Sequence, residues 1–322
     1  DPSEIGTRTD FSVSQPFDFP TAYAYRNRIS DLKNEQAELE YQKQRLEILH
    51  KARVLCGELT YQNALLSEHN KRVYHAGQIA ETYKKKLENG EASVLALNKA
   101  RVYLLNLSKE REAAEIERRN LLAELARLNG GNAIAFNDSV FSTPQLLPGF
   151  GQWYAKAEKN NPVLQWLKQE LAIMQKQQQL QLALSLPRFS AGYMSEKVVG
   201  QQFQGVTLGI TIPLWEDKNN VKYARAKSRA IEESQADAKL QFYNRLKAQY
   251  AKTVELQNSI NSYRSKLKQY NNRELILKAL QKGEISLGEY YIELRLYYES
   301  TDKLLEMERS MNSALNELLK FL

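Results

Sequence analysis

The chain carries the same seven-residue pattern twice: residues 87–93 read LENGEAS, and residues 280–286 read LQKGEIS. Leucine, glycine, glutamate and serine stand at equivalent places in both stretches. Glycine suits the left-handed residue that closes a helix, and serine suits the N-cap that opens the next one. The pattern therefore predicts two helical hairpins, in which Gly90 and Gly283 each close a helix and the serines open the following one.

A second pair of stretches repeats at nearly the same offset. Residues 11–16 read FSVSQP and residues 208–213 read LGITIP, so each alternates like a strand and ends in proline. The two prolines are 213 − 16 = 197 residues apart, and the two hairpin glycines are 283 − 90 = 193 apart. Two anchors at similar offsets indicate an internal duplication. We expect a first repeat over 1–130, an irregular equatorial linker over 131–150, and a second repeat over 151–322.

The helices between these anchors are expected to be very long. From Thr21 to Leu87 only Gly57 and Gly77 weaken a helix, at about 1 kcal/mol each. Apolar residues recur in steps of 3, 4 and 7, the seam of a coiled coil. At 1.5 Å per residue such a helix is roughly 100 Å long, so we expect an elongated, mainly α fold of antiparallel coiled-coil helices.

Further helices follow from the same periodicity. The second half predicts another long helix that runs to the turn near Gly283, and each turn is followed by a shorter return helix, over 94–129 and 287–321. One more helix is expected over Gln152–Leu184.

A few strands complete the prediction. Residues 206–213 place Val206, Leu208, Ile210 and Ile212 on one face. Residues 9–17 form another strand, and residues 186–195 turn back through 199–202 to give a β-hairpin over 186–213. Strands of about 10 residues with one apolar face are typical of a transmembrane β-barrel, whereas an isolated small sheet leaves open edges. Three strands cannot close a barrel alone, so closure requires an oligomer.

Composition excludes several classes of protein. The 322 residues include 14 Gly, 8 Pro and a single cysteine, Cys56, so a disulfide scaffold is excluded. Mean hydropathy is -0.57, and no uncharged apolar run approaches the ~18–20 residues of a membrane-spanning helix. The net charge of +7 comes from basic residues mixed with acidic ones, which argues against a nucleic-acid interface.

The chemistry-bearing residues do not form a catalytic constellation. Met307 and Met311 lie one helical turn apart, and His69 and His75 are expected on different helix faces, so packing is the favoured interpretation of all four. Cys56 is interpreted in the same way. No nucleophile with a base, phosphate-binding loop or metal-ligand spacing is recognisable. We therefore expect no enzyme activity, no cofactor and no metal site.

Several motifs together resemble the TolC-like outer-membrane efflux channels, over essentially the whole chain. NPVL at 161–164, leading into Leu186-Pro187, resembles the opening of a helix and the strand entry of that family. Residues 12–16 and 209–215 resemble its two strand exits, and the two Gly-Glu turns resemble its two hairpin tips. Six motifs in the same order, with an internal duplication, carry the resemblance.

The resemblance implies a homotrimer with an α-barrel in the periplasm and a β-barrel in the outer membrane of a Gram-negative bacterium. It implies a passive conduit for small molecules or metal cations, with outer-membrane lipid, a periplasmic adaptor protein and an inner-membrane pump as partners. The hairpin tips would contact the adaptor. The residues at these tips are Gly90, Glu91, Ser93, Gly283, Glu284 and Ser286.

The resemblance also suggests where a selectivity gate lies. Glu289 follows Gly283 by six residues, at a place where members of the family can carry an acidic residue that narrows the tip and favours cations. Glu293 stands one helical turn further along the same face. The alternative for Glu289 is a surface acid that pairs with Arg295 or a nearby lysine.

The chain departs from the family pattern at its start. A family protomer has two helical segments and a strand before the point where this chain begins, so the sequence predicts an N-terminally truncated member. Two other classes stay open: an elongated periplasmic adaptor, and a structural coiled coil without a membrane role. An adaptor predicts one hairpin with many strands, and a plain coiled coil does not explain the paired strands.

Overall fold

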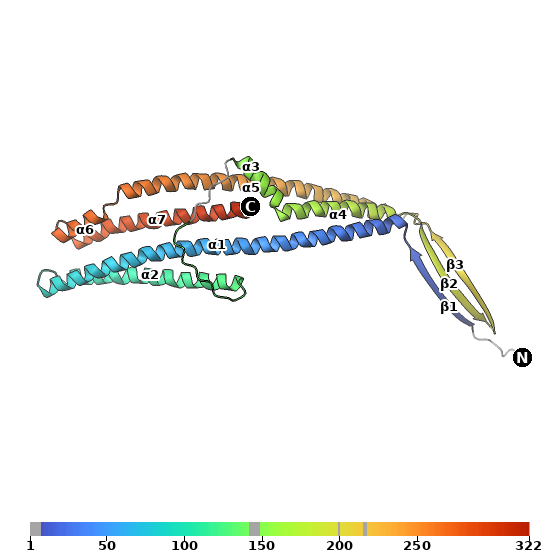
Figure 1. The fold of residues 1–322 in the computed structure, drawn as a ribbon, viewed down its shortest axis with the longest axis horizontal. Helices are drawn as coiled ribbons and strands as arrows, with labels where there is room; N and C mark the ends of the chain where they lie inside the picture. The colour runs from blue at the N-terminus through green and yellow to red at the C-terminus, as the bar shows by residue number, and fades with distance from the viewer. Residues whose placement is uncertain (1–7, 142–148, 199, 215–217, 322) are drawn as a thin grey trace. The chain divides into compact units, whose positions relative to one another are not determined.

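The computed structural model describes residues 8–141, 149–198, 200–214 and 218–321. The predicted linker and the predicted turn at 199–202 fall partly outside these residues. Figure 1 shows the elements along the chain, which are β1 (Arg8–Phe17), α1 (Pro20–Glu88), α2 (Val94–Leu128), α3 (Phe150–Asn160), α4 (Pro162–Leu184), β2 (Arg188–Val198), β3 (Gln201–Thr211), α5 (Lys218–Gln269), α6 (Arg273–Lys282) and α7 (Leu287–Leu319). The protein is mainly helical with one small sheet, as the sequence predicts.

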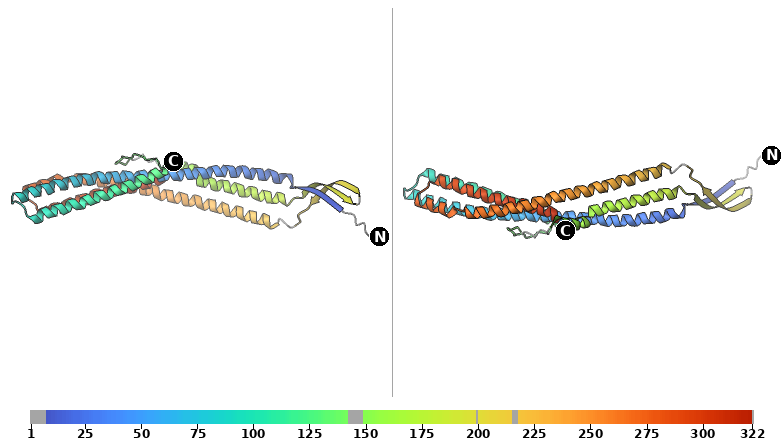
Figure 2. Two further views of the ribbon diagram at one scale, coloured as in Figure 1. Left: turned by 90° about the horizontal axis from the view of Figure 1, so that it is seen from below. Right: turned by 90° about the horizontal axis from the view of Figure 1, so that it is seen from above.

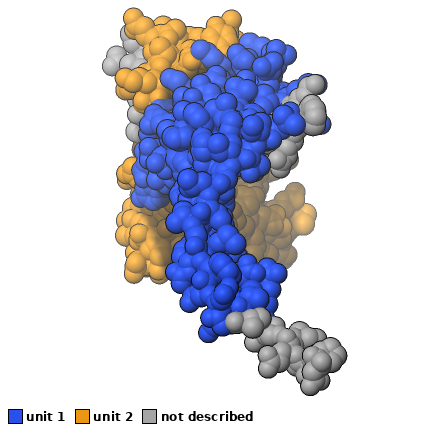
Figure 3. Space-filling model, turned by 90° about the vertical axis from the view of Figure 1, so that its right-hand side faces the viewer, with its two compact units in different colours: residues 1–44, 161–242 blue, residues 45–160, 243–322 orange. Residues whose placement is uncertain are grey.

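Two compact units divide the chain, and Figure 3 colours them separately. Unit 1 comprises Asp1–Gln44 and Asn161–Phe242, and unit 2 comprises Arg45–Asn160 and Tyr243–Leu322. Helices α1 and α5 each contribute residues to both units. The division into two sequence repeats is a different one and stays a prediction.

Helix α1 confirms the predicted length. It has 69 residues and continues through Gly57 and Gly77, because neither glycine meets a second helix breaker nearby. The return helix α2 has 35 residues and ends within a residue of the predicted limit. In the three views of Figures 1 and 2, α2 runs back beside the last part of α1.

The second long helix is shorter than predicted. Helix α5 ends at Gln269, and the separate helix α6 begins at Arg273 and carries the chain to Gly283. The break falls at a pair of asparagines, where the Asn271 side chain accepts a hydrogen bond from the Arg273 backbone N–H at 3.3 Å. Such side-chain bonds compete with the helical hydrogen bonds, so the prediction of one uninterrupted helix was wrong.

The single helix predicted over Gln152–Leu184 was also wrong. It is two helices, α3 and α4, which meet at Asn161 and Pro162. Proline lacks a backbone N–H and disfavours a helical conformation at the preceding residue. Asn161 is the N-cap of α4, and its side chain accepts a hydrogen bond from the Val163 N–H at 2.9 Å. The boundary between the two units falls at this break.

The three strands form one antiparallel sheet in the order β1-β2-β3. Strand β1 confirms the predicted strand over 9–17. Strand β2 extends from Arg188 to Val198, three residues beyond its predicted end, and β3 ends at Thr211 instead of reaching Pro213. Proline cannot donate to a neighbouring strand, so the ladder stops before it.

Each unit has its own apolar core. In unit 1, Ile29 and Leu32 of α1 pack with Ile173 and Met174 of α4. In unit 2, residues of α1, α2, α6 and α7 form a larger cluster centred on Tyr290 and its neighbours. No described helix is both long enough and apolar enough to cross a membrane.

The break between α3 and α4 predicts a specific stability effect. Replacing Asn161, which is buried at 3% exposure, by Ala removes the cap of α4. We expect a loss of about 1 kcal/mol, within the range known for N-cap residues, and recovery in Asn161→Asp. Thermal unfolding followed by circular dichroism measures the effect. The neighbouring Asn160→Ala is the control, because Asn160 is the exposed last residue of α3. Equal losses in both variants would contradict the assigned cap.

Candidate functional site

The first hairpin turn closes α1 with a left-handed glycine. Gly90 has φ +77°, and its N–H donates to the Leu87 carbonyl at 3.0 Å. The Glu91 N–H donates to the Lys86 carbonyl at 2.7 Å. This pair of bonds is the Schellman motif. Ser93 then caps α2, accepting a hydrogen bond from the Ala96 N–H at 3.2 Å.

The second hairpin turn has the same geometry. Gly283 also has φ +77°, and its N–H donates to the Leu280 carbonyl at 3.1 Å. The Glu284 N–H donates to the Ala279 carbonyl at 2.9 Å, and Ser286 caps α7. The predicted helix-closing glycines and helix-opening serines are therefore confirmed in both turns. Since both turns belong to unit 2, the repeated sequence pattern marks repeated backbone geometry in one unit.

The two turns differ in one carboxylate. Glu289 accepts a hydrogen bond from the Ser286 backbone N–H at 2.7 Å, while its own N–H donates to the Ser286 hydroxyl at 3.2 Å. This is a capping box, and these hydrogen bonds to Ser286 lower the pKa of Glu289. The first turn has Ala96 at the equivalent place. The carboxylate thus stabilises the turn, and Arg295, its suggested partner, pairs instead with Glu299 at 3.5 Å.

The second gate candidate lies beside a groove. Glu293 is exposed on α7, and it lines a cavity of about 350 Å³ where α5, α6 and α7 meet around the break after Gln269. Tyr263, Tyr270 and Tyr297 line the same cavity. The structure therefore separates the two candidate acids: one is bound into the turn, and the other faces an open groove.

An apolar cluster supports both turns. Ile79 and Ala80 of α1 pack with Leu280 of α6 and with Leu287 and Tyr290 of α7. Tyr103 of α2 stacks on Tyr291 of α7 with ring centroids 3.9 Å apart. These contacts hold the α1–α2 hairpin against the α6–α7 hairpin, so the two turns are parts of one packed body.

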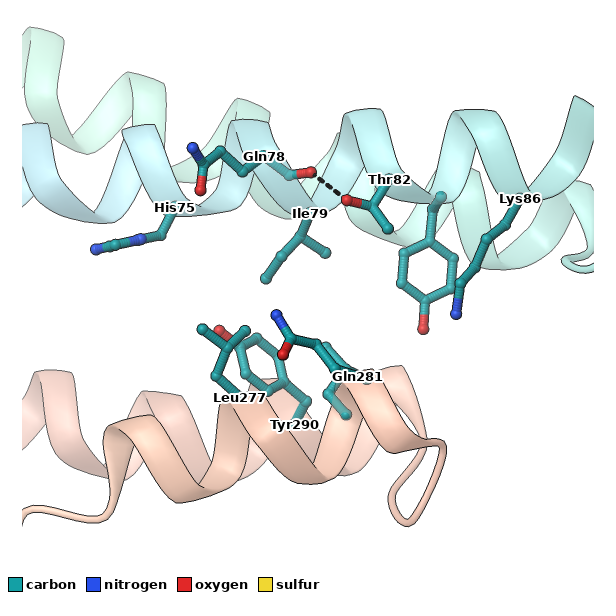
Figure 4. A pocket seen from close by; sticks show the side chains of 10 residues that line it. His75, Gln78, Ile79, Thr82, Lys86, Leu277, Gln281 and Tyr290 are labelled. Atoms are coloured by element: carbon teal, nitrogen blue, oxygen red, sulfur yellow. Dashed lines mark hydrogen bonds between the residues drawn. The ribbon is translucent and has the colours of Figure 1, made fainter.

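A small cavity lies between the hairpins, close to the second turn (Figure 4). It measures about 150 Å³, and Figure 4 shows side chains from α1 facing Leu277, Gln281 and Tyr290 across it. On the α1 side, the Thr82 hydroxyl donates to the Gln78 carbonyl at 2.8 Å. Lys86 places its ammonium 5.6 Å from the centre of the Tyr83 ring. The cavity belongs to the seam between the two hairpins.

The sheet in unit 1 is the second surface of interest, because its register places apolar side chains on one face. Phe11 lies opposite Ser195, Val13 opposite Tyr193, and Tyr193 opposite Val206. The large apolar residues of this face are Phe11, Val13, Phe17, Phe189, Tyr193, Val206, Leu208 and Ile210. All are exposed, from 41% at Tyr193 to 83% at Leu208. From Phe11 to Phe17 the face extends about 20 Å at 3.3–3.4 Å per residue.

The opposite face of the sheet carries mostly small or polar residues, together with the exposed Met194 and Phe203. Its middle rows carry Ser12, Ser14, Ser190, Gly192, Thr207 and Gly209. A Cβ on Gly192 would lie 2.7 Å from the Thr207 hydroxyl oxygen and 2.7 Å from the Val13 carbonyl oxygen. Only glycine fits there, so this face is tightly spaced. The sequence predicted the apolar face of β3 but could not show that β1 and β2 add to it, because register is not readable from one strand.

Two of the residues for which the sequence favoured a packing role lie in buried or partly buried places. Met311 is buried at 4% exposure, and Cys56 is partly buried in α1, where burial raises the pKa of its thiol. Within the described part of the chain, no three His, Cys, Asp or Glu residues gather as a metal site would require.

Comparison with known proteins identifies solved structures with a similar fold. No sequence-family model matches the chain, and no protein of curated function does. Solved structures do match, each over 98% of this chain. They include the CmeC outer membrane channel of Campylobacter jejuni (14% identity, TM-score 0.74, 77% of its chain covered) and the outer membrane protein VceC of Vibrio cholerae (12%, 0.76, 87%). A third is the MtrE outer membrane channel of Neisseria gonorrhoeae in its open state (11%, 0.71, 80%).

These likenesses confirm the mainly helical, TolC-like part of the predicted fold class, and the predicted barrel and trimer stay predictions. At such low identity they concern the fold and not the activity. The chain has the TolC-like fold that its motifs suggested.

Replacing glycine by alanine is predicted to destabilise both turns but not the interior of α1. Gly90→Ala or Gly283→Ala places a Cβ in a left-handed conformation, so we expect each to cost about 1–2 kcal/mol. Gly77→Ala is the matched control, because Gly77 is inside α1 with open space around it, and helix propensity there favours Ala by about 1 kcal/mol. Thermal unfolding of the three variants tests this. A loss in Gly77→Ala equal to that in the turn variants would contradict the turn geometry.

Proposed function

We propose that this chain is the outer-membrane channel component of a tripartite efflux system and acts as a passive conduit across the periplasm and the outer membrane. One observation carries the proposal: in a fold shared with outer membrane channels, the sheet exposes a predominantly apolar face about 20 Å long. That length is close to the apolar band of about 25 Å on membrane barrels.

In this proposal one face of the sheet contacts lipid and the other contacts water. The apolar face, which includes Val206 and Leu208, lies against outer-membrane lipid. The face with Ser12, Ser14 and Thr207 lines a water-filled lumen. The alternation of apolar and small polar residues along each strand supports this orientation, since membrane barrels alternate in the same way.

Closure of the barrel requires other copies. Among the described residues, β1 and β3 each have one edge without a partner strand. Unpaired backbone groups are costly in lipid, so the edges must be paired. We assign this role to a homotrimer, localised in the outer membrane of a Gram-negative bacterium and extending into the periplasm.

The two hairpin turns are assigned to contact a periplasmic adaptor, which links the channel to an inner-membrane pump. Their residues Gly90, Glu91, Ser93, Gly283, Glu284 and Ser286 are exposed. Schellman motifs and serine caps fix both backbones, which lowers the entropy lost when a partner binds. Energy would come from the pump, so no catalytic residue is assigned.

The acidic residues of α7 are proposed to favour cations. Of the two candidates, Glu293 is the better placed, because it is exposed beside an open groove while Glu289 accepts the Ser286 N–H. In a trimer, each acid would occur three times and form a ring, and rings of carboxylates select cations in channels.

Detergent extraction of the outer-membrane fraction tests the proposal. We expect a particle with the mass of three chains, and we expect it to give stepwise conductance in planar lipid bilayers. A protein that purifies without detergent as a monomer, or a trimer that never conducts, would overturn the proposed function.

The same bilayers test the gate assignment. Glu293→Gln should lower the preference for cations over anions, measured as a shift of the reversal potential in a salt gradient. Glu289→Gln should leave the cation preference nearly unchanged, because glutamine can still accept the Ser286 N–H in the capping box and the groove carboxylate of Glu293 remains. Cation preference that falls only in Glu289→Gln would show that the assignment of the two acids is reversed.

A further inference from the structure

Three helices of unit 2 meet around a buried arginine. Arg72 of α1 is 3% exposed and donates two hydrogen bonds to Asp302 of α7, at 2.9 and 2.5 Å. Its guanidinium also lies 4.4 Å from the centre of the Tyr298 ring. Both oxygens of Asp302 are therefore used by Arg72. Tyr298 belongs to the apolar cluster that supports the hairpin turns.

A buried histidine lies beside this ion pair. His69 precedes Arg72 by one turn of α1 and is 7% exposed. Its Nδ1 atom is buried and has no hydrogen-bond partner in the described part of the chain. The nearest acid is Glu110 of α2, whose Oε2 lies 3.7 Å away, too far for a hydrogen bond.

Three carboxylates and one guanidinium surround His69. Glu68 and Arg72 face it from α1, Glu110 from α2 and Asp302 from α7. Burial lowers the pKa of His69, and the neighbouring Arg72 lowers it further, against smaller opposite effects of Asp302 and Glu68. Burial also raises the pKa of Glu110, so its charge is weakened at the same acidic pH.

We propose that His69 is an acid-sensitive element that loosens the packing of α1 against α2 and α7. A proton on His69 places a second positive charge beside the buried Arg72, whose one carboxylate partner is already occupied. The resulting repulsion weakens the contact between the two hairpins. Because Tyr298 is shared with the apolar cluster beneath both turns, the effect reaches the turns themselves. The proposal does not depend on the proposed channel function.

The sign of the pH effect follows from linkage. The unfolded chain takes up a proton at His69 near the ordinary histidine pKa of about 6.5, while the folded chain resists it. Stability from this residue is therefore complete above about pH 6.5 and is lost as the pH falls toward the lowered folded-state value. The ratio of folded to unfolded protein falls about tenfold for each pH unit between the two values.

Thermal unfolding of the full chain in detergent, from about pH 7.5 to about pH 5, tests the proposal. We expect the wild-type Tm to fall with acidification and the fall to be clearly smaller in His69→Gln. His75→Gln is the matched control: His75 is on the same helix, half-buried, and its ring contacts Tyr74 instead of the ion pair. If His69→Gln loses as much Tm as the wild type, the proposal is overturned.

The variant Glu110→Gln provides a second test of the proposal. Removing the one acid that α2 offers to His69 should enlarge the acid-induced fall in Tm. A fall that shrinks in Glu110→Gln would show that loss of an interaction made by the ionised Glu110, and not the proton on His69, drives the fall, and would also overturn the proposal. Neither measurement involves conductance or oligomeric state, so this inference and the proposed function fail independently.

Discussion

The exposed apolar face of the sheet is the constraint on which the interpretation of this protein depends. Three antiparallel strands place eight large apolar side chains on one side and mainly small or polar residues on the other. Burying apolar surface is worth roughly 25 cal/mol per Å², so a continuous face of this kind needs an apolar environment. The helices depend less on an apolar environment, because in each unit they already bury a cluster of apolar side chains.

Much of the helical structure could be predicted from the sequence, because helix ends have local signals. Gly90 and Gly283 mark left-handed helix ends, and the serines that follow mark N-caps. The break after Gln269 was missed, and the helix predicted over 152–184 ran through the break at Asn161, although the NPVL motif there resembled the opening of a helix. Asn161-Pro162 and Asn271-Asn272 carried the relevant signals, which are local hydrogen bonds and a missing N–H.

Contacts between distant residues were beyond prediction for a different reason. The pairing of Arg72 with Asp302 joins residues 230 positions apart, and nothing local marks either one as buried. The register that aligns Phe11, Tyr193 and Val206 on one face is likewise a property of three strands together. Glu289 is a different case: it was interpreted as a gate acid or a paired surface acid, although the spacing of Ser286 and Glu289 is itself the local signature of the capping box that the structure shows. Function is therefore assigned to surfaces that only the fold assembles.

Accessibility of a nitroxide on β3 tests the central claim most directly. The label would be attached at Leu208→Cys or at Thr207→Cys, in a Cys56→Ser background, with the protein in lipid bilayers. Our account predicts that collisions with molecular oxygen, which concentrates in lipid, dominate at position 208. Collisions with a water-soluble nickel chelate should dominate at position 207. Equal behaviour at the two neighbouring positions would contradict the assignment of one sheet face to lipid and the other to water.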